Sequence, residues 1–476
     1  MRTLLWFRRD LRVTDNMALY HAAKESSDGV VGLYLATPGQ WESHNDADCK
    51  VGFWMRNLRS LSESLTKLNI PLLIEDCKSF ENSAEAVVRH AKKNECQSVF
   101  VNREYEVNEL KRDARAERNC QASGIDFRRF HDRVIVPPRE ITTKDGRFYC
   151  VFTPYKKVWN TKAIDFGQPL LYPARQPKIP IEPSPIPQQL GRYQIHDSLE
   201  SLWPAGEAEA NKRLTRFGKR IQEYDSARDV PSEIGTSSLS PYLAAGVISP
   251  RQCLTFALIQ NQGQIEGPNE GAKIWISELT WRDFYTHVMV GFPRVSKDLP
   301  FKLKTNAIPW RDDREEFEAW TKGQTGYPIV DAGMRQLNQT GWMHNRLRMV
   351  TAMFLTKNLL IDWRMGQRYF MEKLIDGDLA ANNGGWQWSA STGTDAVPYF
   401  RIFNPFSQSK RFDPEGEFIK TMCPELETVP AKSLHDPAKL SKAIEQLGID
   451  YPDYVVQYKH SRERALKAFK SLNSTS

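Results

Sequence analysis

Short apolar runs alternate with amphipathic stretches in the first quarter of the chain. Each run is short, as expected for a strand that is buried on both faces. The runs lie at residues 3–7, 30–35, 70–74 and 98–101. Apolar positions at helical spacing between them predict helices at 16–24, 51–68 and 84–93. Alternating strands and helices predict a doubly wound parallel α/β domain, which we place at residues 1–135.

From about Val134 this alternation stops. Residues 167–187 contain seven prolines, at positions 169, 173, 177, 180, 183, 185 and 187. Proline lacks the amide hydrogen that a helix needs, and closely spaced prolines keep a chain extended. We therefore expect a semi-rigid connector between two domains at residues 136–205.

After Glu207 the pattern changes to long helical periods with few strand signals. The predicted helices span 208–227, 251–260, 270–290, 314–321, 332–340, 345–360, 367–374 and 437–447. The second domain, residues 206–476, is therefore expected to be all-helical.

The composition is that of an ordinary globular protein. Of the 476 residues, 40% are hydrophobic and 26% are charged, and a chain of this length exceeds one compact core. We expect no membrane-spanning helix because no run of about 20 apolar residues is present, and the early charges at the N-terminus exclude a secretory signal. The seven scattered cysteines form no CxxC pair, so we expect reduced thiols in a cytoplasmic protein and no metal site.

The net charge of +7 is compatible with a polyanionic partner such as DNA, although a solvated surface gives the same total. Nothing in the sequence indicates oligomerisation, and we expect a monomer. The first predicted strand is followed by Arg8-Arg9-Asp10-Leu11-Arg12 rather than by a GxGxxG dinucleotide fingerprint. The N-terminal domain therefore either binds another small molecule or is structural.

Eight of the 13 tryptophans lie between Trp275 and Trp388. One predicted helix presents a single stripe that consists of Trp275, Glu278, Trp281, Arg282 and Tyr285. Two tryptophans with an acid and a base are unusual for a core face and for a solvated face alike. The stripe suits a cleft that stacks flat bases, and a packing role is the alternative.

Two further stretches carry polar side chains that suit nucleic acid or a nucleotide. In GWMHNRLRM (341–349), Asn345 can read a base edge and Arg346 can bind a phosphate, whereas His344 suits a structural role. In GTSSLSP (235–241), small hydroxyl residues before a proline suit a neutral phosphate site at a helix start. Taken alone, the second stretch is explained better by an ordinary helix N-cap.

The stretch DGDLAANNGGWQW (376–388) crowds two acids, two amides, two glycines and two tryptophans together. It could enclose a flat heteroaromatic molecule or form a helix–loop corner with core tryptophans. No serine–histidine–aspartate order or metal cluster is present, so the chemistry must come from a bound cofactor.

Several of these stretches resemble the photolyase/cryptochrome family, and the resemblance runs through almost the whole chain. They are WFRRDLR (6–12), WISELTWRDFY (275–285), GYPIVDAGMR (326–335), GWMHNRLRM (341–349) and DGDLAANNGGWQW (376–388). The resemblance is strongest to class I photolyases for cyclobutane pyrimidine dimers with a folate antenna.

The resemblance implies a U-shaped FAD in the helical domain. The positions that match the family's FAD contacts are Tyr224, Thr236, Ser237, Ser238, Leu239, Ser240, Trp275, Asp376, Gly377, Asp378 and Asn382. Asn382 matches the residue that faces flavin N5, and an amide there is the photolyase pattern.

The implied reaction is light-driven DNA repair, in which excited reduced FAD gives an electron to a flipped-out dimer. The dimer pocket is matched by Glu278, Trp281, Asn345, Met349 and Trp388, and the other DNA contacts by Arg228, Arg282, Tyr285, Arg346 and Gln408. A protonated Glu278 would stabilise the dimer radical anion by a hydrogen bond. Trp386, Trp363 and Trp310 match the relay that reduces the flavin from the surface; three core tryptophans are the alternative.

The family's folate-binding positions are matched by His44, Asn108, Glu109 and Lys297. The resemblance therefore implies a 5,10-methenyltetrahydrofolate antenna, and Glu109 suits the donor edge of a pterin. Ser296 stands where the family often has cysteine, and a flavin or deazaflavin antenna is the alternative.

Two other functions are consistent with the same family. A signalling cryptochrome is disfavoured by Asn382 and by the short stretch that follows the helix-like residues 461–471. A photolyase for (6-4) photoproducts uses histidines at the lesion, where this chain has Asn345 and Met349, although His344 is adjacent.

Overall fold

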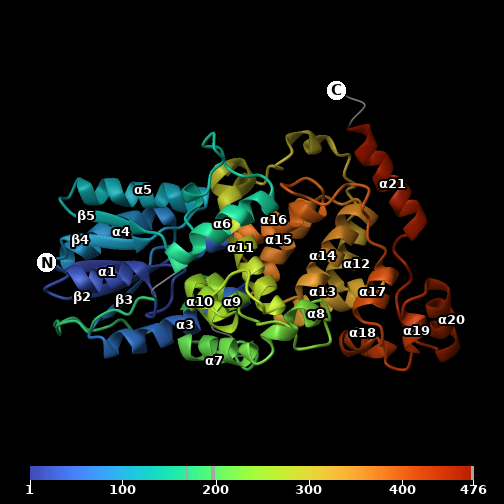
Figure 1. Cartoon of the computed structure of the whole chain (residues 1–476), viewed down its shortest axis with the longest axis horizontal. Helices are drawn as coiled ribbons and strands as arrows, with labels where there is room; N and C mark the ends of the chain where they lie inside the picture. The colour runs from blue at the N-terminus through green and yellow to red at the C-terminus, as the bar shows by residue number, and fades with distance from the viewer. Residues whose placement is uncertain (168–169, 195–198, 473–476) are drawn as a thin grey trace. The chain divides into compact units, whose positions relative to one another are not determined.

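The structure is a computed structural model that describes residues 1–167, 170–194 and 199–472 (Figure 1). The chain divides into two compact units, each of which gathers segments that are distant in sequence. The first unit contains Met1–Gln222, Ser237–Pro293 and Ile375–Asp378. The second unit contains Glu223–Thr236, Arg294–Leu374 and Leu379–Ser476.

A five-stranded sheet forms the centre of the N-terminal region in the first unit (Figure 1). Its strands are β1 (Thr3–Phe7), β2 (Val30–Ala36), β3 (Leu72–Asp76), β4 (Ser98–Asn102) and β5 (Asp126–Phe130). They pair in parallel in the order β3-β2-β1-β4-β5. This confirms the predicted α/β class. The pattern did not predict β5, whose sequence DFRRF places charges among its apolar residues.

The helices of this region are α1 (Met17–Glu25), α2 (Pro38–Ser43), α3 (Asp48–Lys67), α4 (Phe80–Lys93) and α5 (Val107–Gln121). Asn16 caps α1 by accepting a hydrogen bond from the Leu19 amide at 3.1 Å. The pattern did not predict α5, because its buried side chains include Glu109, Arg112 and Asp113. Arg112 pairs with Asp113 and Glu104 inside the protein, so these charged residues weaken the apolar periodicity without exposing the helix.

The predicted connector contains a helix that the pattern did not predict, α6 (Phe152–Gly167). Its buried residues Tyr155, Trp159 and Ala163 recur every four positions, which is helical spacing. From residue 170 to the short hairpin β6 (Gln189–Leu190) and β7 (Tyr193–Gln194) no helix occurs, as the prolines predict. Pro169 lies outside the described residues.

The extended segment follows β3, an outer strand of the sheet. The Ser184 amide donates to the Leu72 carbonyl at 2.9 Å, and the Ser184 hydroxyl accepts from the Ile74 amide at 3.0 Å. The segment therefore covers an edge that would otherwise expose unpaired backbone groups.

The chain after Glu207 is helical, as predicted. The helices are α7 (Glu207–Gly218), α8 (Tyr224–Ala227), α9 (Ser240–Ala245), α10 (Pro250–Gln260), α11 (Glu270–Gly291), α12 (Arg314–Lys322), α13 (Pro328–Thr340), α14 (Asn345–Met353), α15 (Trp363–Lys373), α16 (Leu379–Ser389), α17 (Pro405–Phe412), α18 (Glu417–Met422), α19 (Ala431–Leu434), α20 (Pro437–Leu447) and α21 (Tyr458–Ser471). Two predicted helices are interrupted. The helix predicted at 208–227 breaks after Gly218, and α14 changes to a π-helical turn at Phe354–Asn358.

Candidate cofactor, electron-transfer and DNA sites

Helix α11 in the first unit carries the predicted aromatic stripe. Trp275 is buried and packs against Phe217, with ring centroids 5.0 Å apart. Trp281 is half-buried and stacks on Phe152 at 3.6 Å with an interplanar angle of 6°. Glu278 and Tyr285 are also half-buried. The stripe thus combines core packing at Trp275 with partly exposed residues that can meet a ligand.

Another side of α11 holds two buried polar residues that the sequence analysis did not identify. Asp283 accepts hydrogen bonds from Trp159 Nε1 at 2.9 Å and from both amides of residues 135–136. His287 Nε2 accepts from the Tyr149 amide at 3.0 Å. Burial raises the pKa of Asp283 to about 6 and lowers the pKa of His287 to about 4. These contacts anchor the stretch after β5 to the helix.

Arg282 and Asp378 are connected through Arg133, all within the first unit. The Arg282 guanidinium donates to the Arg133 carbonyl. Arg133 in turn donates to Asp378 Oδ2 at 2.6 Å and to Glu106 Oε1 at 3.0 Å. The predicted cofactor residue Asp378 therefore has a fixed position, and Arg133, which the sequence analysis missed, provides it.

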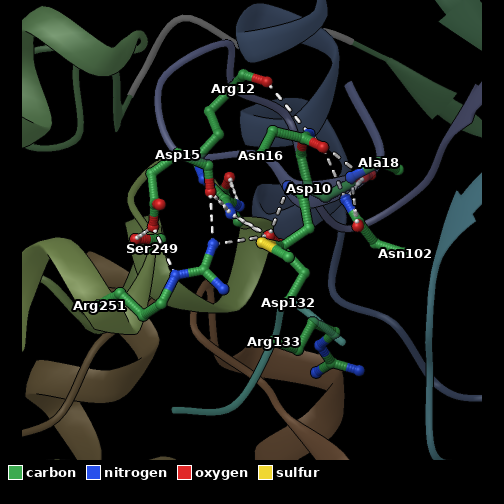
Figure 2. A network of polar contacts seen from close by, with 12 residues as sticks. Asp10, Arg12, Asp15, Asn16, Ala18, Asn102, Asp132, Arg133, Ser249 and Arg251 are labelled. Atoms are coloured by element: carbon green, nitrogen blue, oxygen red, sulfur yellow. Dashed lines mark hydrogen bonds and ion pairs between the residues drawn. The ribbon is translucent and has the colours of Figure 1, made fainter. Parts of the chain in front are cut away.

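Asp10 and Arg12 of the Arg8-Arg9-Asp10-Leu11-Arg12 motif belong to a buried polar network (Figure 2). Arg12 donates to both carboxylate oxygens of Asp132, at 2.6 and 2.7 Å. Asp10 accepts from Asn102 Nδ2 at 2.7 Å, and Arg251 donates to Asp15 at 3.0 Å.

Asp10 follows β1 and Asn102 ends β4, so the network lies at the carboxyl ends of these neighbouring strands. Doubly wound sheets usually bind ligands at that place. Here the polar side chains pair with one another, which favours a structural role for Asp10 and Arg12.

Three of the four predicted antenna residues come together in the first unit. Asn108 Nδ2 donates to His44 Nε2 at 3.0 Å, and His44 Nδ1 lies 3.9 Å from Glu109 Oε1. Glu109 is only 5% exposed, and its Oε2 has no hydrogen-bond partner in the part of the chain that the structure describes. Burial, together with the nearby Glu106, raises the pKa of Glu109 to about 8. Lys297 belongs to the second unit.

The predicted phosphate segment contradicts the ordinary N-cap interpretation. Leu239 occupies the N-cap position of α9, and no side chain makes a cap hydrogen bond there. Ser238 has a φ of 51°, in the left-handed region that non-glycine residues seldom adopt. The segment is therefore shaped for something other than helix capping. Thr236 belongs to the second unit, as does the buried Tyr224.

Asn382 begins a chain of amide contacts within the second unit. Its Nδ2 donates to the Gln367 carbonyl at 3.0 Å. The Gln367 side chain accepts from Asn383 Nδ2 at 2.7 Å and donates to Asp298 at 2.9 Å. These bonds fix the orientation of the Asn382 amide. Gln367 carries no local sequence signal that distinguishes it.

Helix α16 places Trp386 and Trp388 on opposite faces, because two residues correspond to about 200° of rotation. Trp386 is 2% exposed, whereas Trp388 is half-buried. Trp386 packs directly on Gly366, where an added Cβ would lie 2.1 Å from the indole. The geometry of α16 therefore places the two tryptophans on different sides of the helix, as the separate roles implied by the resemblance require.

Trp363 and Trp310 belong to the same unit as Trp386. Trp363 is fully buried at the start of α15, within one turn of Gly366. Trp310 is half-buried and meets Phe469 edge-on at 6.4 Å. One end of the proposed relay is therefore inside the core and the other reaches solvent.

Helix α14 begins with His344 as its N-cap. His344 Nδ1 accepts from the Arg346 amide at 3.2 Å, and burial lowers the pKa of this histidine to about 4. Asn345, Arg346 and Met349 follow on the helix, and Gln408 lies half-buried on α17. The cap contact agrees with a structural role for His344.

Within the described residues, no group of three or more histidine, cysteine, aspartate or glutamate side chains could hold a metal ion. No helix in that part of the chain is long and apolar enough to cross a membrane.

Known proteins match this chain along nearly its full length. Residues 3–177 match the family described as DNA photolyase, and residues 275–471 match the FAD binding domain of DNA photolyase. The deoxyribodipyrimidine photo-lyase of Vibrio cholerae is 45% identical, covering 98% of this chain and 99% of that protein.

Two solved structures share the fold. A bacterial class III photolyase from Agrobacterium tumefaciens has a TM-score of 0.86 at 32% identity and covers 99% of this chain and 98% of its own. An archaeal photolyase from Sulfolobus tokodaii, solved with two FAD molecules, has a TM-score of 0.79 at 30% identity and covers 99% of this chain and 100% of its own.

Proposed function

Because the chain belongs to the photolyase/cryptochrome family, we propose how its own residues carry out light-driven repair of cyclobutane pyrimidine dimers in DNA. The protein is an FAD-containing lyase of the deoxyribodipyrimidine photo-lyase type, and it breaks carbon–carbon bonds. One segment, α16 with the turn before it, supports this function most directly. Hydrogen bonds hold Asp378 and Asn382 in this segment, and its two tryptophans lie on opposite faces of the helix.

FAD is held by Tyr224, Thr236–Ser240, Trp275, Asp376–Asp378 and Asn382. The residues suit this group: Thr236–Ser240 offer neutral hydroxyl and amide donors for a pyrophosphate, and the amide of Asn382 is already oriented. When bound in its fully reduced form, FAD would supply one electron to the dimer under light and take it back after the ring has opened. Arg282 supports this site by holding Arg133, which positions Asp378.

The dimer is received by Glu278, Trp281, Asn345, Met349 and Trp388. Trp281 stacks on Phe152 and is half-buried, so it supplies a fixed aromatic surface for stacking on a base. Glu278 contacts the dimer, and Asn345 reads the base edge. Arg228, Arg282, Tyr285, Arg346 and Gln408 position the DNA.

Trp386, Trp363 and Trp310 carry an electron inward from the surface. Trp386 packs on Gly366, which lies one helical turn after Trp363 on α15, and this supports the first step of the proposed relay.

His44, Asn108, Glu109 and Lys297 bind an antenna, 5,10-methenyltetrahydrofolate. The unsatisfied Oε2 of Glu109 supports this, because a buried carboxyl without a partner suits a ligand that donates N–H groups. Residues 1–135 then form the antenna domain, 136–205 the connector and 206–476 the catalytic domain. The protein acts as a monomer beside the chromosome in the bacterial cytoplasm.

A light-dependent repair assay with purified lesions tests the function. Oligonucleotides with one cyclobutane dimer should be repaired under blue light and not in the dark, whereas (6-4) photoproducts should persist. Repair of the (6-4) lesion would require a different pocket, and repair of neither lesion would favour a photoreceptor. The absorption spectrum of freshly purified protein distinguishes a folate from a flavin antenna.

A further inference from the structure

Arg346, a proposed DNA contact, is held by an acidic residue to which the reaction assigns no role. Its Nε and Nη2 both donate to Asp229 Oδ1, at 3.2 and 2.6 Å. Its guanidinium also lies 4.4 Å over the ring of Phe412, and Nη1 lies 3.7 Å from Met349 Sδ. All four residues belong to the second unit. The guanidinium thus contacts a carboxylate, an aromatic ring and a thioether at once.

Asp229 occupies a constrained position. It follows α8 and the proposed DNA contact Arg228, whose guanidinium lies 5.3 Å over Tyr224. The loop closes where Gly235 meets Ala227, since an added Cβ on Gly235 would lie 2.2 Å from the Ala227 carbonyl. This closure limits how far Asp229 can move away from Arg346.

We propose that Asp229 is a specificity-determining positioning residue, which orients Arg346 for the backbone of dimer-containing DNA and weakens its attraction for undamaged DNA. The proposal rests on the proposed function of Arg346 as a DNA contact.

The reasoning follows from charge. A free arginine attracts any phosphate, so it strengthens binding to undamaged DNA as much as binding to the lesion. An arginine paired with a carboxylate is largely neutralised, and the pair is only 19% and 31% exposed, so solvent screens it incompletely. Asp229 holds the guanidinium of Arg346 in one direction. Arg346 therefore contributes most to binding when a DNA phosphate lies in that direction. Damaged DNA with its dimer flipped out provides that geometry, whereas a regular duplex does not.

Asp229→Asn tests the proposal on the FAD-loaded protein. We expect the affinity for undamaged duplex to rise about 3- to 10-fold, because one arginine becomes available to phosphates. The affinity for dimer-containing duplex should change much less, so the ratio of the two affinities falls by a similar factor. The salt dependence for undamaged DNA should steepen by about 0.9 in the slope of log K against log salt, as expected for one additional phosphate contact.

Asp225→Asn is the matched control. Asp225 is exposed on α8, so the variant removes the same charge four residues away from Asp229. It should raise the affinities for both DNAs by one factor and leave their ratio unchanged. The FAD absorption of every variant shows whether the protein is folded and loaded.

Arg346→Gln separates the two levels of the argument. If this variant binds dimer-containing DNA as tightly as the wild type, the proposed role of Arg346 is wrong, and the role of Asp229 falls with it. If Arg346→Gln weakens binding but Asp229→Asn leaves the ratio unchanged, only the role of Asp229 is overturned. Weaker binding of Asp229→Asn to both DNAs would also overturn it. The double variant should show the same ratio as Arg346→Gln alone.

Discussion

Binding of the folate antenna should depend on pH through Glu109. The carboxyl is buried without a hydrogen-bond partner for Oε2 in the described chain, and its pKa is raised from 4.5 to about 8. Without ligand, Glu109 is therefore mostly protonated at pH 7. A pterin edge that donates N–H groups favours the ionised carboxylate, so binding releases a proton.

The sign and size follow from linkage. Because the pKa of Glu109 is raised to about 8, the protonated carboxyl stabilises the ligand-free protein below pH 8. This stabilisation of the ligand-free protein is lost as the pH rises through 8. Folate affinity should therefore rise with pH and level off above 8. Each pH unit well below 8 corresponds to about 1.4 kcal/mol, or tenfold, and Glu109 is already half protonated at pH 8. The affinity should therefore fall roughly fiftyfold from pH 8 to pH 6 if the bound carboxylate stays ionised.

Titration of methenyltetrahydrofolate into the FAD-loaded protein in the dark, at pH 6, 7 and 8 and constant ionic strength, measures this slope. Glu109→Gln should remove this pH slope, because an amide cannot ionise. The neighbouring His44 should contribute little to the slope, because burial lowers its pKa from 6.5. Glu85→Gln, a change at an exposed acid on α4, should keep the slope. A flat wild-type profile, or an unchanged slope in Glu109→Gln, would refute the reasoning.

Three further predictions concern the core. Trp363→Phe should slow photoreduction of the flavin and leave repair by pre-reduced enzyme intact. Transient absorption measures the photoreduction and a repair assay measures the repair; loss of both activities would reject the relay. Gly366→Ala should lower the free energy of unfolding by about 1–3 kcal/mol, because its Cβ would lie 2.1 Å from the Trp386 indole; an unchanged denaturation midpoint would contradict this packing. Asp283 has a pKa raised from 3.8 to about 6, so its contribution to stability is present below pH 3.8 and lost as pH rises through 6, by roughly 3 kcal/mol. Asp283→Asn should flatten the stability profile over that window in urea unfolding; a profile parallel to that of the wild type would mean that Asp283 is not the titrating group.

The sheet was predictable because strands buried on both faces appear as continuous apolar runs, such as residues 3–7. Helix α5 was not, because Arg112 and Asp113 lie on its buried face and bind each other there. A periodicity argument treats charged residues as surface residues, whereas ion pairs also occur inside proteins. The prolines predicted the extended segment, and their prominence obscured the helical spacing of Tyr155 and Trp159.

The candidate sites likewise contain residues that the sequence indicates and residues that only the structure reveals. Glu278, Asn345 and Asn382 lie in stretches whose composition is unusual, so the sequence indicates them as candidates. The residues that orient other groups, such as Arg133 and Gln367, are distant in the chain and surrounded by ordinary sequence. Only the folded chain brings Arg133 to Asp378 and Gln367 to Asn382.

The paired charges at the ends of β1 and β4 limit how this protein can evolve. Replacing Arg12 alone would leave the fully buried carboxylate of Asp132 without its main partner, and breaking such a pair usually costs about 3–5 kcal/mol. That is a large fraction of the stability of an ordinary domain. A lineage that acquires a chromophore at this place would therefore lose least stability by changing the paired charges together, because removing one partner at a time carries this cost.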